Sequence, residues 1–74
     1  MDRTDFALFM KHKRAAAGLS QRGLAKAIRV TQTKVHGWEC GSRAPHSRHL
    51  LHLFSALELN VQDQQLALIL LART

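Results

Sequence analysis

Hydrophobic residues recur along this chain at the spacing of α-helices. Leu50, Leu53, Phe54 and Leu57 follow one another at i, i+3, i+4 and i+7, which places all four on one helical face. Similar stripes, separated by short polar breaks, predict five helices. Their expected ranges are about residues 5–17, 21–27, 32–40, 46–57 and 61–72. The pattern therefore predicts an all-α fold, a compact bundle of five helices.

Capping residues mark several of the expected boundaries. Ser20 and Thr31 precede the second and third segments, where a hydroxyl can accept a free N–H of the opening turn. Gly18 follows the first segment, where a left-handed residue is favoured, and Pro45 is expected to be the first residue of the fourth. The second and third segments are too short to be stable alone. They must therefore pack on each other and on the rest of the chain.

Length and composition place the chain among small intracellular proteins. Its 74 residues allow one domain with a small core. Its single cysteine excludes an internal disulfide and fits a reducing cytosol. Asp2 and Asp5 lie in an N-terminal stretch without a long apolar run, which indicates no signal peptide. The longest apolar run, Leu66 to Ala72, is far shorter than the roughly 20 residues that span a bilayer. We therefore expect a cytoplasmic location and no membrane contact.

The balance of charge points to a polyanionic partner. The formal net charge is +6 and the sequence pI is about 10.9, which is typical of nucleic-acid-binding proteins. A basic surface that merely keeps the chain soluble is the alternative. The charge alone does not decide between them.

The stretch from Leu19 to Glu39 carries an ordered set of residues that favours a nucleic-acid-binding surface over a merely soluble one. The set is Ser20-Gln21, Leu24-Ala25, Val30-Thr31-Gln32, Val35 and Trp38-Glu39, with Gly41 close behind. It resembles the helix-turn-helix of the Cro/phage-repressor class, the XRE or lambda-repressor-like family. The similarity extends over roughly residues 5 to 59, through Lys13-Arg14 and Gly18-Leu19 upstream and Arg43 and Pro45 downstream. The resemblance implies a DNA-binding domain whose recognition helix is the third segment.

The recognition helix supplies the candidate base-reading residues, which are Gln32, Thr33, Lys34, His36 and Gly37. At 100° per residue, most of them lie opposite Val35 and Trp38. The amide of Gln32 suits adenine and the methyl group of Thr33 suits thymine. Lys34 lies to one side, where it can reach a phosphate or a guanine. Gly37 either permits close approach of the backbone or simply makes no contact.

The residues around this helix are candidates for phosphate contacts. The resemblance implies that the amide and backbone N–H of Gln21 touch a phosphate. Arg43, with Ser42 and His46 beside it, precedes the fourth helix, whose N-terminus also favours an anion. The resemblance further pairs Arg14 with Glu39, which would clamp the first helix to the third.

Two residues depart from the pattern of the resembled family. Gly23 stands where an acid usually completes a capping box, and this should weaken the second helix by about 0.5–1 kcal/mol relative to alanine. Arg29 stands where glycine is common in a left-handed turn. It either accepts about 1 kcal/mol of strain or belongs to a turn of different geometry.

The last segment is apolar on nearly every side. We expect Leu66, Ile69 and Leu70 to face the core, which leaves Leu68 and Leu71 facing outward. Exposed leucines of this kind mark an association surface. Leu68 and Leu71 are therefore predicted to form the interface of a homodimer that reads two half-sites about 34 Å apart in double-stranded operator DNA.

Together these features predict a transcriptional repressor of a palindromic operator, of the autoregulated phage or plasmid type, in the bacterial nucleoid. The alternative is an antitoxin-like DNA-binding module with a protein partner. No cofactor, small-molecule ligand or catalytic residue is expected. His36 and Cys40 have i, i+4 spacing, but two ligands do not make a structural zinc site, so no metal is expected either.

Overall fold

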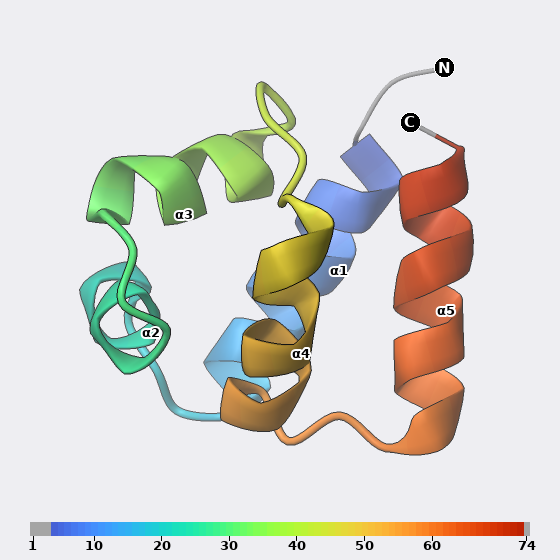
Figure 1. Cartoon of the computed structure of the whole chain (residues 1–74). Coiled ribbons are helices and arrows are strands. Elements are labelled where there is room, and N and C mark those ends of the chain that lie inside the picture. The colour runs from blue at the N-terminus through green and yellow to red at the C-terminus, as the bar shows by residue number, and fades with distance from the viewer. Residues whose placement is uncertain (1–3, 74) are drawn as a thin grey trace.

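The computed structural model describes residues 4–73, and within that range it contains five α-helices and no strand (Figure 1). They are α1 (Thr4–Ala16), α2 (Gln21–Ala27), α3 (Gln32–Cys40), α4 (Ser47–Ala56) and α5 (Val61–Ala72). The prediction of an all-α, five-helix fold is confirmed. Asp2, one of the two acids of the N-terminal stretch, lies outside the described residues. Among the helices of residues 4–73, none has both the length and the apolar character needed to cross a bilayer.

The core forms where α1 packs against α3 and α5 while α2 packs against α3. In Figure 1, α2 and α3 lie to one side of α4, and α5 runs along the other side. Phe6 and Met10 of α1 are buried together with Leu24 of α2, Val35 of α3 and Leu53 of α4. Buried hydrophobic side chains from four helices thus fix the helix-turn-helix segment on the rest of the chain.

Local capping explains why the two short helices begin where they do. The Ser20 hydroxyl accepts the Gly23 N–H at 2.9 Å, and the Thr31 hydroxyl accepts the Lys34 N–H at 3.3 Å. Gly18 ends α1 in the left-handed region with φ of 75°. All three roles agree with the sequence prediction. Each cap satisfies a backbone group that the helix itself leaves without a partner.

The turn between α2 and α3 keeps the left-handed geometry although its residue is an arginine. Arg29 has φ of 59°. The turn is closed by the Val30 N–H, which donates to the Ala25 carbonyl at 2.9 Å. Of the two alternatives that the sequence left open, the chain therefore adopts the strained one, at a cost of about 1 kcal/mol.

The start of α4 differs from the prediction. Pro45 is buried but precedes the helix, and His46 is the N-cap. The Nδ1 atom of His46 accepts the backbone N–H of Arg48 at 3.2 Å. The expectation that Pro45 is the first helical residue was wrong because the imidazole supplies an acceptor for a free N–H, which a proline at that position cannot do.

The orientation of α5 also differs. Ala67 is buried and Leu70 and Leu71 pack against the core, whereas Leu66, Leu68 and Ile69 are 43%, 48% and 52% exposed. The expectations that Leu66 and Ile69 face inward and Leu71 faces outward were therefore wrong. Two polar contacts hold this orientation. The Lys13 ammonium of α1 lies 3.1 Å from the Asp63 carboxylate, and the Gln64 amide donates to the Leu59 carbonyl at 3.0 Å.

Candidate nucleic-acid interface

The outward face of α3 carries polar side chains at helical spacing. Gln32, Thr33 and His36 are exposed, whereas Val35 and Trp38 on the opposite face are buried. With Gln21 of α2, the three exposed residues line a hollow of about 250 Å³. The structure thus brings four of the predicted DNA-contacting residues together. Their amides, hydroxyl and imidazole offer the donors and acceptors that base edges recognise.

The sequence suggested that Gly37 lies open on this face, but it does not. It is buried, and a Cβ added to it would lie 3.0 Å from Cδ and 3.1 Å from Cγ of Arg43. The stem of Arg43 therefore covers the position that a side chain at residue 37 would occupy. The correction has a simple cause, because the loop after α3 folds back over the helix at its one residue without a side chain.

The carbonyl of Gly37 anchors the loop that folds back. It accepts the backbone N–H groups of Gly41, Ser42 and Arg43, the latter two at 3.1 Å. Gly41 adopts φ of 82° to end the helix. A second hollow lies at the border between α3 and this loop, and its lining includes Lys34, Arg43, His46 and Arg48. No acidic side chain lines it, so this border carries concentrated positive charge.

An ion pair joins α1 to α3 beneath the outward face. Arg14 donates from Nε to Oε2 of Glu39 at 2.6 Å and from Nη2 to Oε1 at 3.0 Å, as the resemblance implied. The Glu39 side chain is only 2% exposed. Gln21 also donates to Oε1 of Glu39 at 3.1 Å. Since an amide nitrogen carries two N–H groups, Gln21 retains a second donor for a phosphate.

His49 is the residue here that the sequence interpretation missed. It was not among the candidate residues, but it is half-buried and its ring centroid lies 5.9 Å from that of Trp38. Burial lowers the pKa of His49 below 6.5, and the charges of Arg48, Lys34, His46 and His52 lower this pKa further. A usable pattern was present, since His49 precedes the buried Leu53 by four residues and so shares its helical face.

Histidine and cysteine do not form a metal site in the described part of the chain. Within residues 4–73, no three side chains of the His, Cys, Asp or Glu type lie close enough to hold an ion. Cys40 is exposed, and hydrogen bonding to Ser42 lowers the pKa of its thiol.

Comparisons with known proteins agree with this geometry. A model of the helix-turn-helix domain matches residues 5–68, which is most of the chain. The chain belongs to the helix-turn-helix domain family. The predicted resemblance to XRE-like helix-turn-helix proteins is confirmed, and the protein is a DNA-binding transcription regulator. Comparison with curated proteins gives no match.

Two crystal structures resemble this helix-turn-helix protein along most of its length. One is the restriction-modification controller protein C.AhdI from Aeromonas hydrophila, with a TM-score of 0.75 and 29% identity over 84% of this chain and 94% of that chain. The other is the clp gene regulator ClgR from C. glutamicum, with a TM-score of 0.76 and 30% identity over 96% of this chain and 87% of that chain.

Proposed function

We propose that this protein is a transcriptional repressor that binds a palindromic operator as a homodimer. The observation that carries the proposal is the exposed row of Gln32, Thr33 and His36 on α3, bordered by cationic side chains on one side and by Gln21 on the other. A helix of this kind enters the major groove, and its borders meet the phosphates of the two strands.

The polar residues divide into two roles. Gln32, Thr33 and His36 read base edges, with Lys34 reaching a phosphate or a guanine at the border of the helix. Gln21, Ser42, Arg43 and His46 hold the DNA backbone. Gly37 contributes by seating Arg43 rather than by touching a base, because the Arg43 stem covers it.

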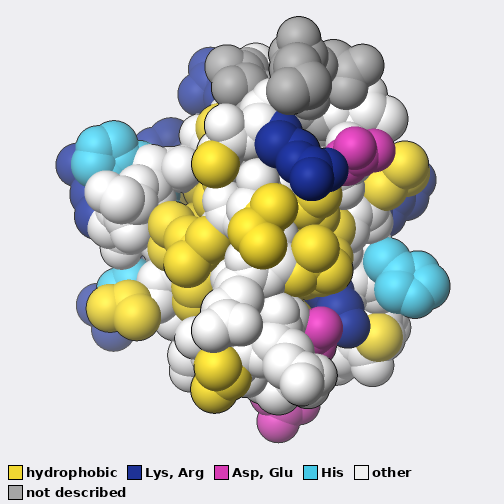
Figure 2. All heavy atoms as spheres, turned by 90° about the vertical axis from the view of Figure 1, so that its right-hand side faces the viewer, with side chains coloured by type: hydrophobic (Ala, Val, Ile, Leu, Met, Phe, Trp, Pro, Cys, Tyr) yellow, Lys and Arg dark blue, Asp and Glu magenta, His cyan; other side chains and the backbone are white. Residues whose placement is uncertain are grey.

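The dimer forms through the outer face of α5. Figure 2 shows hydrophobic side chains gathered across the middle of the face that α5 occupies in Figure 1. Leu66, Leu68 and Ile69 are exposed there, which is unusual for side chains of this size within one short helix. A two-fold contact between two copies of α5 covers these residues and fixes the separation of the two recognition helices. Leu68 remains in the proposed interface, whereas Leu71 packs against the core and holds α5 in place.

The restriction-modification controller and the gene regulator that this chain resembles are both regulatory proteins by name. Repression is the simplest action for such a domain, because a dimer seated on a promoter blocks polymerase without any further activity. Control of its own gene, as in phage and plasmid repressors, follows from competition for that promoter.

The roles are tested by binding isotherms on a selected duplex at several salt concentrations. Gln32→Ala should change which sequence is preferred, by roughly 1–3 kcal/mol at one base pair. Arg43→Ala should weaken binding to all sequences and flatten the salt slope by about one unit. A changed sequence preference in Arg43→Ala would show that the roles are assigned wrongly. A reporter placed behind the same duplex separates repression from activation.

A further inference from the structure

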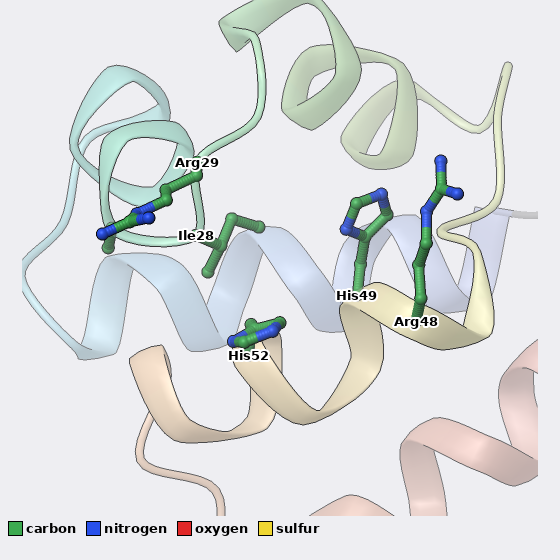
Figure 3. Close-up of a pocket in the computed structure, with 6 residues that line it drawn as sticks. Ile28, Arg29, Arg48, His49 and His52 are labelled. Atoms are coloured by element: carbon green, nitrogen blue, oxygen red, sulfur yellow. The ribbon is translucent and has the colours of Figure 1, made fainter.

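A groove outside the DNA-reading face runs between the α2–α3 turn and α4 (Figure 3). It is open to solvent, has a volume of about 590 Å³ and is lined by Ala27, Ile28, Arg29, Arg48, His49 and His52. In Figure 3, Arg48 and His49 rise from the start of α4 at one end, His52 lies opposite Ile28, and Arg29 lies at the other end. The volume falls within the range of pockets that hold small ligands.

The groove has no negative charge of its own. Its four polar lining residues are two arginines and two histidines, and no acid lines it. Residues 4–73 contain four acids, Asp5, Glu39, Glu58 and Asp63, and none of them lines the groove. Glu39 is paired with Arg14 and Asp63 with Lys13. Arg48 also lines the hollow at the border of α3, so the positive charge continues from the loop after α3 into the groove.

The pKa of His49 is lowered by burial and by this positive charge, because basic side chains surround its ring. Around it lie Arg29 of the turn, Lys34 of α3, Arg43 and His46 of the loop, and Arg48 and His52 of α4. Burial and then the neighbouring positive charges lower the pKa of His49. An anion in the groove offsets these charges and therefore raises this pKa.

We propose that the groove is a phosphate-binding site in which Arg48, His52 and Arg29 are the donors. Guanidinium groups bind phosphate oxygens through paired N–H donors, and here they stand at the two ends of the groove. This arrangement fits two or more phosphates in a row rather than a single small anion. Such a row is found in a DNA strand and in a free diphosphate compound. The possibility that the phosphates belong to DNA rests on the proposed function, whereas a free diphosphate compound does not require it.

The test is a titration of the full chain with inorganic pyrophosphate, followed by NMR of the imidazole and guanidinium groups. The His49 and His52 signals and those of Arg29 and Arg48 should shift together along one saturable curve, and the pKa of His49 should rise. Arg48→Gln should weaken binding about tenfold, since it removes a charge-assisted contact. His52→Gln, at an exposed position that does not threaten folding, should also weaken it.

The matched control is Arg22→Gln, which removes an exposed arginine of α2 outside the groove and should leave the affinity unchanged. Shifts that spread over all basic residues without saturating would overturn the site. Equal loss in Arg22→Gln and Arg48→Gln would overturn it as well. Because this titration contains no DNA, its result is independent of whether the chain proves to be a repressor.

A second titration, with saturating operator duplex present, identifies the source of the phosphates. If the DNA backbone fills the groove, pyrophosphate no longer shifts the NMR signals of His49. Arg29→Gln then lowers the salt slope of operator binding by about one unit. If a free phosphate compound is the occupant, pyrophosphate binds the DNA complex as tightly as the free protein. Either result supports the site. Absence of any pyrophosphate effect on His49 in both titrations rejects it.

Discussion

Arg43 lies with its stem directly over Gly37, so that a Cβ on Gly37 would come within 3.0 Å of the Arg43 Cδ atom. The side chain of Arg43, which belongs to the loop after α3, thus lies against the recognition helix. An alanine at residue 37 should push this arginine aside without harming the fold, since the displaced atoms belong to a flexible side chain.

Gly37→Ala should accordingly leave the free energy of unfolding unchanged or raise it by up to about 1 kcal/mol, because alanine favours the helix. It should weaken operator binding several-fold through Arg43. In an Arg43→Ala background the same substitution should have no further effect on the dissociation constant. Additive losses in the double variant would show that Gly37 acts on DNA by some route other than Arg43.

The pair of Arg14 and Glu39 should be strongly coupled. Arg14→Met leaves the Glu39 carboxylate buried beside only the Gln21 amide, and we expect a loss of about 3–5 kcal/mol of stability. A double-mutant cycle by denaturant unfolding should give a coupling above about 1 kcal/mol. The matched control is Lys13 with Asp63, whose side chains are 29% and 26% exposed and whose coupling should be smaller. Equal couplings for the two pairs would reject the clamp.

The strain at Arg29 predicts a stabilising substitution. Arg29→Gly should raise the free energy of unfolding by up to about 1 kcal/mol, because relief of the left-handed strain exceeds the added entropy of the unfolded chain. Glu58→Gly should behave in the same way, since Glu58 has φ of 53°. Lys26→Gly, in the last turn of α2, is the control and should destabilise. Loss of stability at both left-handed positions would show that neither residue is strained.

The outer face of α5 predicts the oligomeric state. Charged residues at Leu68 and Ile69 should give a folded monomer in sedimentation, because both side chains are exposed and neither supports the core. Binding to a duplex with two half-sites should weaken sharply, while binding to one half-site should change little. Leu8→Glu, at a leucine of α1 that is 60% exposed, is the control and should remain dimeric. A Leu68 and Ile69 variant that stays dimeric would reject α5 as the interface.

The sequence predicted those features that depend on neighbours along the chain. The caps at Ser20 and Thr31 and the bounds of α2 and α3 follow from hydrogen bonds that span three or four residues. The apolar face of α4 likewise follows from its i, i+3, i+4 spacing.

The features it did not predict depend on distant contacts. The orientation of α5 follows from the packing of Ala67, Leu70 and Leu71 on the core, with a further contact from Lys13 to Asp63, fifty positions away. A helix that is apolar on every side gives no indication of its inner face. Gly37 was placed on the open surface because nothing in the sequence shows that the stem of Arg43 returns over it. The spacing of His49 from Leu53 indicated its inward-facing side, but its contact with Trp38 depends on how α4 lies relative to α3.

The central claim is that two copies of α3 read a palindromic operator, and selection of bound duplexes from a random pool tests it most directly. We expect enrichment of an inverted repeat whose half-sites are centred about 34 Å apart, roughly one helical turn of DNA. Gln32→Ala should shift the preferred bases within each half-site. Recovery of duplexes without any repeated half-site, or a wild-type preference retained by Gln32→Ala, would contradict the account.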